Sequence, residues 1–214
     1  MGAGTCRLVA LPLSGWRFRA VAPEKLASLV EAVAAIVDEL ERSGLDYAIG
    51  GAMSYSAWAE PRATRDIDVN KWVDVGRLDE AFDTLARAGV RVDRQRACED
   101  AEHRGMFVGH HGEYRVGVFL PSVPFYEVAR RQRRKGRLAD RYSWALSPET
   151  LAVFKLLCFR PKDLVDVKRL LEIQGYRMDR DLVRQSLVDM LGKDDERIRS
   201  PDDLMIEAAP NLIG

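Results

Sequence analysis

Two aspartates separated by one residue are the first side chains in this sequence that could do chemistry. Asp66 and Asp68 lie in the segment DIDVNKW, in which polar and apolar residues alternate. In a β-strand, residues i and i+2 project from the same face, about 6.5–7 Å apart. Two carboxylates held that close repel each other, and a magnesium ion that also binds substrate phosphates would relieve the repulsion. A strand face that points both acids into water explains the pattern equally well.

A pair of glycines, Gly50 and Gly51, lies between a short apolar segment and a segment with helical character, in the string AIGGAMSYSA. Glycine lets the backbone approach a phosphate closely, and the N-terminus of the following helix offers free N–H groups to an anion. Turn glycines are common, so the pair alone is weak evidence. Arg62 and Thr64 follow shortly before Asp66, and the combined string is more specific than its parts.

A single lysine, Lys155, lies inside the apolar string LAVFKLLCF. Ser147 and Pro148 precede the string, and these residue types favour the start of a helix. Burying an unpaired ammonium group costs free energy, so the side chain should either extend to solvent or meet an anion. A phosphate or one of the acidic residues would serve as that anion.

Pro161 should end this helix and begin another, with Lys162, Asp163 and Asp166 in the first turns. Acidic residues there suit the positive end of the helix dipole, which explains them without any role in a site.

The string YAIGGAMSYSAWAEPRATRDIDV resembles the signature of the polymerase-β-type nucleotidyltransferase superfamily, and within it most closely the AbiEii/MenT-like toxins and the small antibiotic nucleotidyltransferases. Their shared pattern is Gly-Gly, a helix, and then Arg-x-Thr-x-Asp-x-Asp on a strand. The resemblance implies that Gly50 and Gly51 cradle the triphosphate of an NTP. It implies that Asp66 and Asp68 hold magnesium, with manganese as an alternative ion. The further nucleotide-binding residues implied by the pattern are Arg62 and Thr64.

The second half of the sequence resembles the C-terminal motif of the AbiEii/MenT-like proteins, in which a lysine, an arginine and Lys-Asp-x-x-Asp complete the active site. The resemblance implies that Lys155 contacts the nucleotide phosphates or the acceptor, and that Asp163 or Asp166 orients it. The choice between these two acids stays open. Arg160 and Lys162 are implied to bind the nucleotide. The resemblance covers about residues 45–172.

One residue departs from the superfamily pattern. A third acid is expected on a later strand, in a context like Arg-Val-Asp-Val-Phe, but this sequence has Gly117 at that place. The missing carboxylate would help to bind the metal and would accept the proton of the acceptor hydroxyl. Glu113 or Asp163 could substitute for it, the enzyme could work slowly with two acids, or the chain could bind nucleotide without turnover. We favour a working or weakened transferase.

The spacing of apolar residues and the positions of glycine and proline predict the helices and strands that must position these residues. We expect an α/β (α+β) fold of the nucleotidyltransferase type, with a mixed sheet and flanking helices in residues 1–121 and a mainly helical part in 122–214 that completes the active site. The expected helices are 23–42, 52–59, 78–88 and 125–131, followed by helices only from residue 147. The expected strands are 46–50, 66–72, 90–92, 106–110 and 114–120.

Composition sets further limits. With 33 basic and 33 acidic residues the formal net charge is zero, which excludes a histone-like or acidic-tail protein. Three widely spaced cysteines argue against a disulfide framework and for the reducing cytoplasm. No apolar run approaches the about 20 residues of a membrane-spanning helix, so we expect no membrane association.

A local basic segment stands out against this neutral background and could attract RNA, although a solvated basic helix face explains it as well. Its residues include Arg130, Arg131, Arg133, Arg134 and Lys135. The leading hypothesis is a magnesium-dependent nucleotidyltransferase toxin that moves an NMP to an RNA 3′ end. The resemblance implies a tRNA as that acceptor and a cognate antitoxin as partner. The alternatives are an antibiotic or protein acceptor, and a catalytically weakened nucleotide-binding module.

Overall fold

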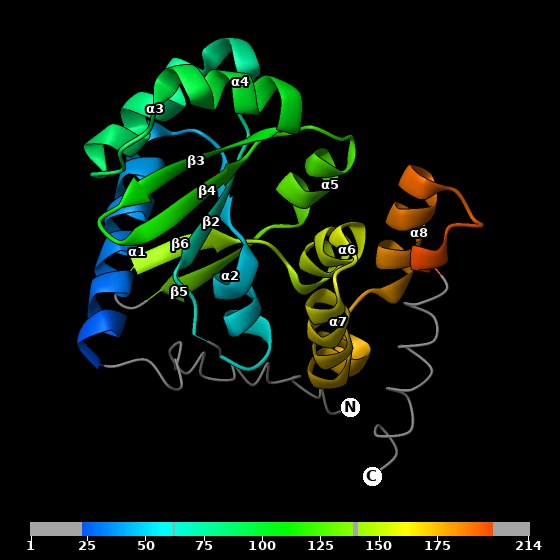
Figure 1. Ribbon diagram of the computed structural model, residues 1–214. Coiled ribbons are helices and arrows are strands. Elements are labelled where there is room, and N and C mark those ends of the chain that lie inside the picture. The colour runs from blue at the N-terminus through cyan, green and yellow to red at the C-terminus, as the bar shows by residue number, and fades with distance from the viewer. Residues whose placement is uncertain (1–22, 62, 139–140, 199–214) are drawn as a thin grey trace, which may run out of the picture.

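The computed structural model describes residues 23–61, 63–138 and 141–198, which form a six-stranded mixed sheet flanked by helices (Figure 1). The strand order is β3-β4-β2-β1-β6-β5. The strands are β1 (Tyr47–Ile49), β2 (Asp66–Lys71), β3 (Met106–His111), β4 (Tyr114–Phe119), β5 (Arg134–Leu138) and β6 (Arg141–Ala145). The helices are α1 (Pro23–Ser43), α2 (Gly51–Trp58), α3 (Leu78–Arg87), α4 (Arg94–Arg104), α5 (Phe125–Gln132), α6 (Pro148–Cys158), α7 (Pro161–Gln174) and α8 (Arg180–Leu191), with short 3-10 turns at Val75–Arg77 and Gly175–Arg177. The expected fold class is confirmed.

The strand that the alternating pattern predicted at residues 66–72 is present as β2, with its apolar residues in the core. Ile67 and Val69 are fully buried and belong to a first hydrophobic core, which α1, α3 and α4 share with one face of the sheet. Asp66 and Asp68 therefore project from the opposite face. β2 runs parallel to β4, and its register sets Asp68 directly opposite Gly117.

A second hydrophobic core lies among α6, α7 and α8, on the right of Figure 1. Ser147 caps α6 by accepting a hydrogen bond from the N–H of Thr150, and Pro148 occupies the first turn. Phe159 then adopts a left-handed conformation with φ of 51° and ends the helix. Pro161 starts α7 while Arg160 is extended, as expected for a residue that precedes proline. The prediction of helices only after residue 147 is confirmed for the described residues.

Four elements differ from the sequence prediction. α4 was not predicted because its segment RQRACEDAEHR is polar almost throughout; Asp93 caps it and Gly105 ends it. The strand expected at 90–92 is reduced to one bridge between Arg91 and His110. β5 and β6 were not predicted either. Three of the five residues of β5 (RKGRL) are basic, which hides the period-two pattern expected of a strand, and β6 (RYSWA) is a short segment directly after this basic stretch.

These two strands change the description of the part that begins at residue 122. β6 pairs with β1 in parallel and β5 pairs with β6, so this part extends the sheet as well as supplying helices. The boundary at residues 121 and 122 stays a prediction. Within the described ranges, the structure holds no helix with both the length and the apolar character needed to cross a bilayer.

Candidate functional site

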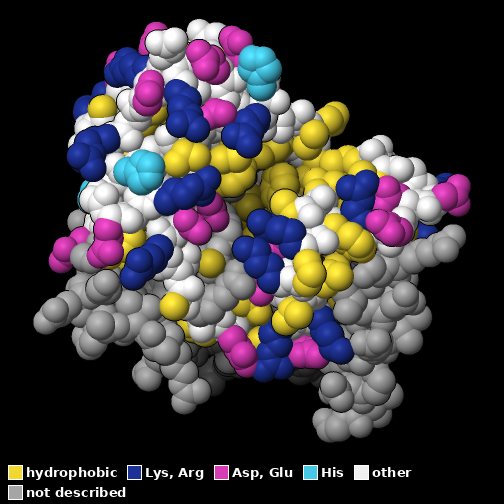
Figure 2. Space-filling model, viewed as in Figure 1, with side chains coloured by type: hydrophobic (Ala, Val, Ile, Leu, Met, Phe, Trp, Pro, Cys, Tyr) yellow, Lys and Arg dark blue, Asp and Glu magenta, His cyan; other side chains and the backbone are white. Residues whose placement is uncertain are grey.

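A cavity of about 610 Å³ separates the polar face of the sheet from α6 and α7. We call it the polar lobe. Figure 2 shows this face of the molecule hollowed, with acidic and basic side chains next to each other at the edge of the hollow. Residues that lie far apart in the sequence therefore meet here. The predicted site residues that line the polar lobe are Gly51, Thr64, Asp66, Asp68, Lys155, Arg160, Lys162 and Asp163.

The acidic pair lies against the start of α2. Gly51 has a φ of +52°, and a Cβ atom on it would come within 1.8 Å of Asp68 Oδ2, so only glycine fits beside this carboxylate. Gly50 does not line the cavity. Instead its N–H donates a hydrogen bond of 2.8 Å to the carbonyl of Asp68, which fixes the turn to the strand. Burial, and then the neighbouring charge of Asp66, raise the pKa of Asp68 above its usual value.

Lys155 is buried and meets two carboxylates of α7. Its ammonium lies 2.5 Å from Asp166 Oδ2 and 3.7 Å from Asp163 Oδ1. Asp163 also accepts a hydrogen bond of 2.6 Å from Arg160 Nε. Burial acts to raise the pKa of Asp163, but the hydrogen bonds and positive charge of Arg160 outweigh it and hold that pKa below its usual value. Of the two acids, Asp166 makes the shorter contact with Lys155, whereas Asp163 also lines the cavity.

Gly117 occupies the place expected for a third acid. A Cβ atom there would lie 3.0 Å from Asp68 Oδ1 and 3.4 Å from Arg115 Nη1. The Arg115 guanidinium also lies 4.0 Å from Asp66 Oδ1 and lines the polar lobe. A cation therefore neighbours both aspartates where the pattern would place a carboxylate. Our sequence analysis missed Arg115, although its position two residues before Gly117 on the same strand face could have indicated it.

The other expected residues are placed as follows. The Thr64 hydroxyl accepts a hydrogen bond of 3.1 Å from the N–H of Asp66, which holds the loop that enters β2. Arg62 lies outside the described residues. Glu113 is in the turn between β3 and β4 and does not line the polar lobe, so Asp163 is the candidate substitute acid that the cavity contains.

The basic segment lies away from the cavity. Arg130 and Arg133 both form ion pairs with Asp46, at 2.8 Å and 2.6 Å. Arg134 contacts the buried Glu149 at 3.3 Å. Arg131 pairs with Glu127, and the Lys135 ammonium lies 5.5 Å from the ring centre of Trp144. These cations therefore have intramolecular partners, and the prediction that they bind RNA stays a prediction.

A second cavity of about 300 Å³ adjoins the polar lobe. We call it the apolar lobe. The two lobes share Gly51, Asp68, Phe119, Lys155, Cys158, Arg160 and Asp163. The residues found in the apolar lobe alone are Asn70, Ser122, Val123, Tyr126, Leu146, Leu151, Phe154 and Leu157. Sequence reasoning missed this lobe, because its lining comes from four separate segments of chain.

The sequence matches no protein-family model and no curated protein. Comparison with solved structures does find relatives in fold. The solution structure of the antibiotic-resistance factor ANT(2″)-Ia aligns with a TM-score of 0.51 at 17% identity, over 86% of this chain and 92% of that one. A crystal structure of ANT(2″)-Ia in complex with adenylyl-2″-tobramycin aligns with a TM-score of 0.50 at 13% identity, over 86% and 98% of the two chains. The chain therefore has a nucleotidyltransferase-like fold.

Proposed function

We propose that this protein is a nucleotidyltransferase that moves an NMP from an NTP to the hydroxyl of an acceptor. The observation that carries the proposal is the polar lobe, which brings Asp66 and Asp68 from the sheet together with Lys155 from α6. The nucleotidyltransferase-like fold supports it.

The residues present fit a magnesium ion. Asp66 and Asp68 project from one face of β2, and the raised pKa of Asp68 reflects repulsion and burial that a cation would relieve. No cluster of three or more His, Cys, Asp or Glu residues that could hold a metal occurs in the described part of the chain. Two carboxylates suit magnesium, which is commonly held by one or two carboxylates together with substrate phosphates. When bound, the ion would neutralise charge on the transferring and leaving phosphates.

The chain itself supplies the remaining positive charge. Arg115, Arg160 and Lys162 line the polar lobe, and the N-terminus of α2 begins there at Gly51. These groups can hold a triphosphate and orient it against the acidic pair. Lys155 is held by Asp163 and Asp166, so its ammonium stays at the meeting point of the two lobes.

The reaction breaks one bond for each bond that forms. The acceptor oxygen bonds to the α-phosphorus, and the bond from that phosphorus to the oxygen bridging to the β-phosphorus breaks. Pyrophosphate leaves with the electron pair, and the hydroxyl proton passes to water. Gly117 provides no carboxylate to take this proton, so we expect a slow enzyme rather than an inactive one.

The resemblance to toxins favours a tRNA 3′ end as acceptor and an antitoxin as partner. The intramolecular ion pairs of Arg130, Arg133 and Arg134 weaken the case for RNA, because these cations are already engaged. We therefore propose a small hydroxyl-bearing molecule as the acceptor.

A labelling experiment tests the proposal. Each of the four NTPs, labelled at the α-phosphate, is incubated with the full chain and magnesium in the presence of small alcohols, total tRNA or protein. We expect transfer of label with equal release of pyrophosphate, reduced at least 100-fold in Asp66→Asn and Asp68→Asn.

Asp181→Asn is the matched control, because Asp181 is exposed on α8 and does not line either lobe. It should retain full activity. The absence of transfer from every NTP to every acceptor, or full activity in Asp68→Asn, would reject the proposal. Labelling of tRNA alone would retain the activity and restore RNA as the acceptor.

A further inference from the structure

We propose that the apolar lobe binds the acceptor, and that this acceptor is an uncharged small molecule whose hydroxyl is attached to, or adjoins, a flat apolar ring. The inference rests on the proposed function, since it assigns a substrate class to the same site.

The two lobes follow each other along β2. Asp66 lines the polar lobe, Asp68 lines both lobes, and Asn70 lines the apolar lobe. A molecule in the apolar lobe therefore approaches Asp68 from the side of Asn70, whereas Asp66 lies on the other side of Asp68 along the strand. This is the position from which an acceptor oxygen could attack an α-phosphate while pyrophosphate leaves toward the polar lobe.

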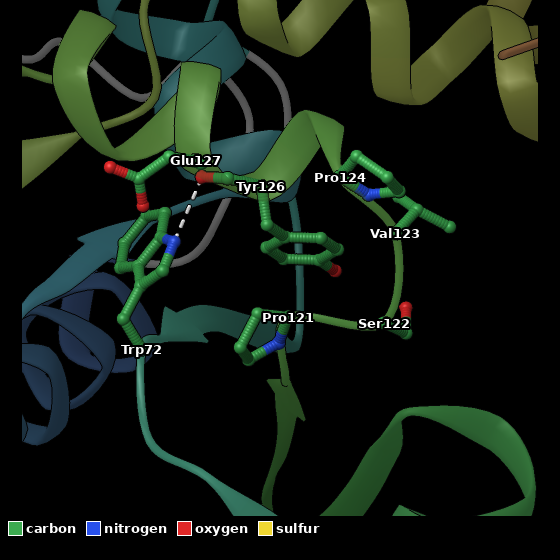
Figure 3. Close-up of a pocket in the computed structure, with 7 residues that line it drawn as sticks. All are labelled: Trp72, Pro121, Ser122, Val123, Pro124, Tyr126 and Glu127. Atoms are coloured by element: carbon green, nitrogen blue, oxygen red, sulfur yellow. Dashed lines mark hydrogen bonds between the residues drawn. The ribbon is translucent and has the colours of Figure 1, made fainter.

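The wall of the apolar lobe is made of rigid parts. Figure 3 shows a neighbouring pocket, which shares Ser122, Val123 and Tyr126 with the apolar lobe. The chain from Pro121 to Pro124 curves there around the ring of Tyr126, and the indole N–H of Trp72 donates a 2.8 Å hydrogen bond to the Tyr126 carbonyl. The Tyr126 and Phe154 ring centres lie 5.0 Å apart. Of these groups, the packed rings of Tyr126 and Phe154 line the apolar lobe and form a surface that is ready before a ligand arrives, which lowers the entropy cost of binding.

The distribution of charge assigns the triphosphate to the other lobe. Arg115 and Lys162 line the polar lobe and not the apolar lobe. The polar lobe is also the larger, at about 610 Å³ against about 300 Å³. The smaller volume is at the lower end of the roughly 300–1,000 Å³ of small-molecule sites.

The same lining disfavours charged acceptors. A polycationic acceptor needs several carboxylates, but the apolar lobe has Asp68 and Asp163, and Asp163 is already paired with Arg160. An RNA end would need cations for its phosphates. The cations of the apolar lobe, Lys155 and Arg160, are shared with the polar lobe and already paired with Asp166 and Asp163, and the rim contributes only the uncharged Ser122 and Val123. An uncharged ring is what this surface can bury without an unpaired charge.

The transfer to this acceptor forms one bond and breaks one. The ring fills the apolar lobe, its hydroxyl oxygen bonds to the α-phosphorus, and pyrophosphate leaves with the electrons of the broken bond. The hydroxyl proton passes to water.

Binding of 2-naphthalenemethanol, a flat uncharged alcohol, tests the inference. Saturation-transfer NMR measures its affinity for the full chain with magnesium, alone and with the α,β-methylene analogue of ATP, which cannot transfer its nucleotide. We expect the two ligands to bind together, and we expect labelled ATP to yield the naphthylmethyl ester of AMP.

Two valines of similar exposure give a matched pair of variants. Val123 is 38% exposed at the rim of the apolar lobe, and Val75 is 44% exposed on the 3-10 turn before α3. Val123→Asp should weaken binding of the alcohol about tenfold, because its charge must be desolvated beside the ring. Val75→Asp should leave the affinity unchanged. Leu157→Trp, which fills the lobe, should also abolish binding of the alcohol while the analogue still binds.

The outcomes separate this inference from the proposed function. Magnesium-dependent binding of the analogue without any binding of the alcohol overturns the inference and leaves the function standing. Competition between the two ligands also overturns it, since the lobe would then hold the nucleobase. Transfer to tRNA or to tobramycin in place of the alcohol overturns it as well. Failure of the α,β-methylene analogues of all four NTPs to bind, each tested in turn, refutes the proposed function itself.

Discussion

Replacing Gly117 by aspartate restores the third acid that the nucleotidyltransferase pattern expects. The register of β4 against β2 sets position 117 opposite Asp68, and its Cβ would lie 3.0 Å from Asp68 Oδ1. That contact is tight, but the atom it meets is the end of a side chain that can rotate slightly. The new carboxylate would therefore face the acidic pair and the acceptor, as a general base must.

Two electrostatic effects of opposite sign decide how much Gly117→Asp changes the stability of the protein. A carboxylate about 4 Å from Asp68 costs up to about 4 kcal/mol at an effective dielectric constant of 20. The Arg115 guanidinium, 3.4 Å from the same Cβ, offsets part of that repulsion. We expect a net loss of about 2 kcal/mol without metal, which lowers Tm by about 4–8 °C in a protein of this size. A general base contributes about 10²–10⁴ in rate, so kcat should rise about 100-fold.

Pyrophosphate release measures the rate, and thermal unfolding with and without 10 mM magnesium measures stability. Gly117→Asn controls for shape, because asparagine has nearly the shape of aspartate but no charge. It should lower Tm less than Gly117→Asp does and should not raise kcat. Gly136→Asp controls for the loss of glycine in a strand, since no atom lies within 4 Å of a Cβ there. If Gly117→Asp loses Tm without metal and regains it with magnesium, but kcat is unchanged or lower, the site already has its base elsewhere and our reasoning about Gly117 is refuted.

Three further substitutions test what the charged groups of Asp68, Lys71 and Asp166 contribute to stability. Because burial and Asp66 raise the pKa of Asp68, its charge costs stability in the absence of metal; Asp68→Asn should raise Tm without magnesium by about 2–4 °C for about 1 kcal/mol, and an unchanged or lower Tm would contradict this. Burial lowers the pKa of Lys71 from 10.5 to about 8, so the unfolded chain binds more protons between these values and stability should rise with pH there. Lys71→Met should therefore raise Tm more at pH 7 than at pH 10, and equal gains would show that this ammonium carries no such cost. Asp166→Ala leaves Lys155 without its 2.5 Å partner and should cost about 3 kcal/mol in urea unfolding, whereas the double variant with Lys155→Met should recover most of that loss; a double variant as unstable as the single one would contradict the pairing.

The parts of the site that sequence could predict are those fixed by local rules. Alternation along β2 sets Ile67 in the core and Asp68 on the opposite face. A lysine among apolar neighbours must extend to solvent or meet an anion, and the structure shows the second outcome. Arg160 and Pro161 fix the turn between α6 and α7 through the conformation that proline imposes on the residue before it. These constraints act within a few residues, so the sequence carries them.

Other features depend on contacts between distant segments. Arg133 lies in a basic stretch whose composition resembles a solvated helix face, yet its ion pair with Asp46 forms only because β6 lies beside β1. The apolar lobe requires Gly51, β2, the segment from Phe119 to Tyr126 and the segment from Leu146 to Asp163 to meet. α4 lacks an apolar stripe, and it is held by its capping residues and by Ala97 and Ala101 in the first core. Local sequence patterns do not predict such contacts between distant segments.

The two hydrophobic cores contribute different halves of the site. Asp68 is attached to a strand that packs on the first core, whereas Lys155 is attached to a helix of the second. Partial unfolding at the boundary between the two cores would separate the carboxylate of Asp68 from the ammonium of Lys155, while the helices and strands on both sides stay formed. On gradual heating, turnover should therefore disappear before circular dichroism records any loss of secondary structure, because we expect the docking of the two halves to set the temperature limit of the proposed activity.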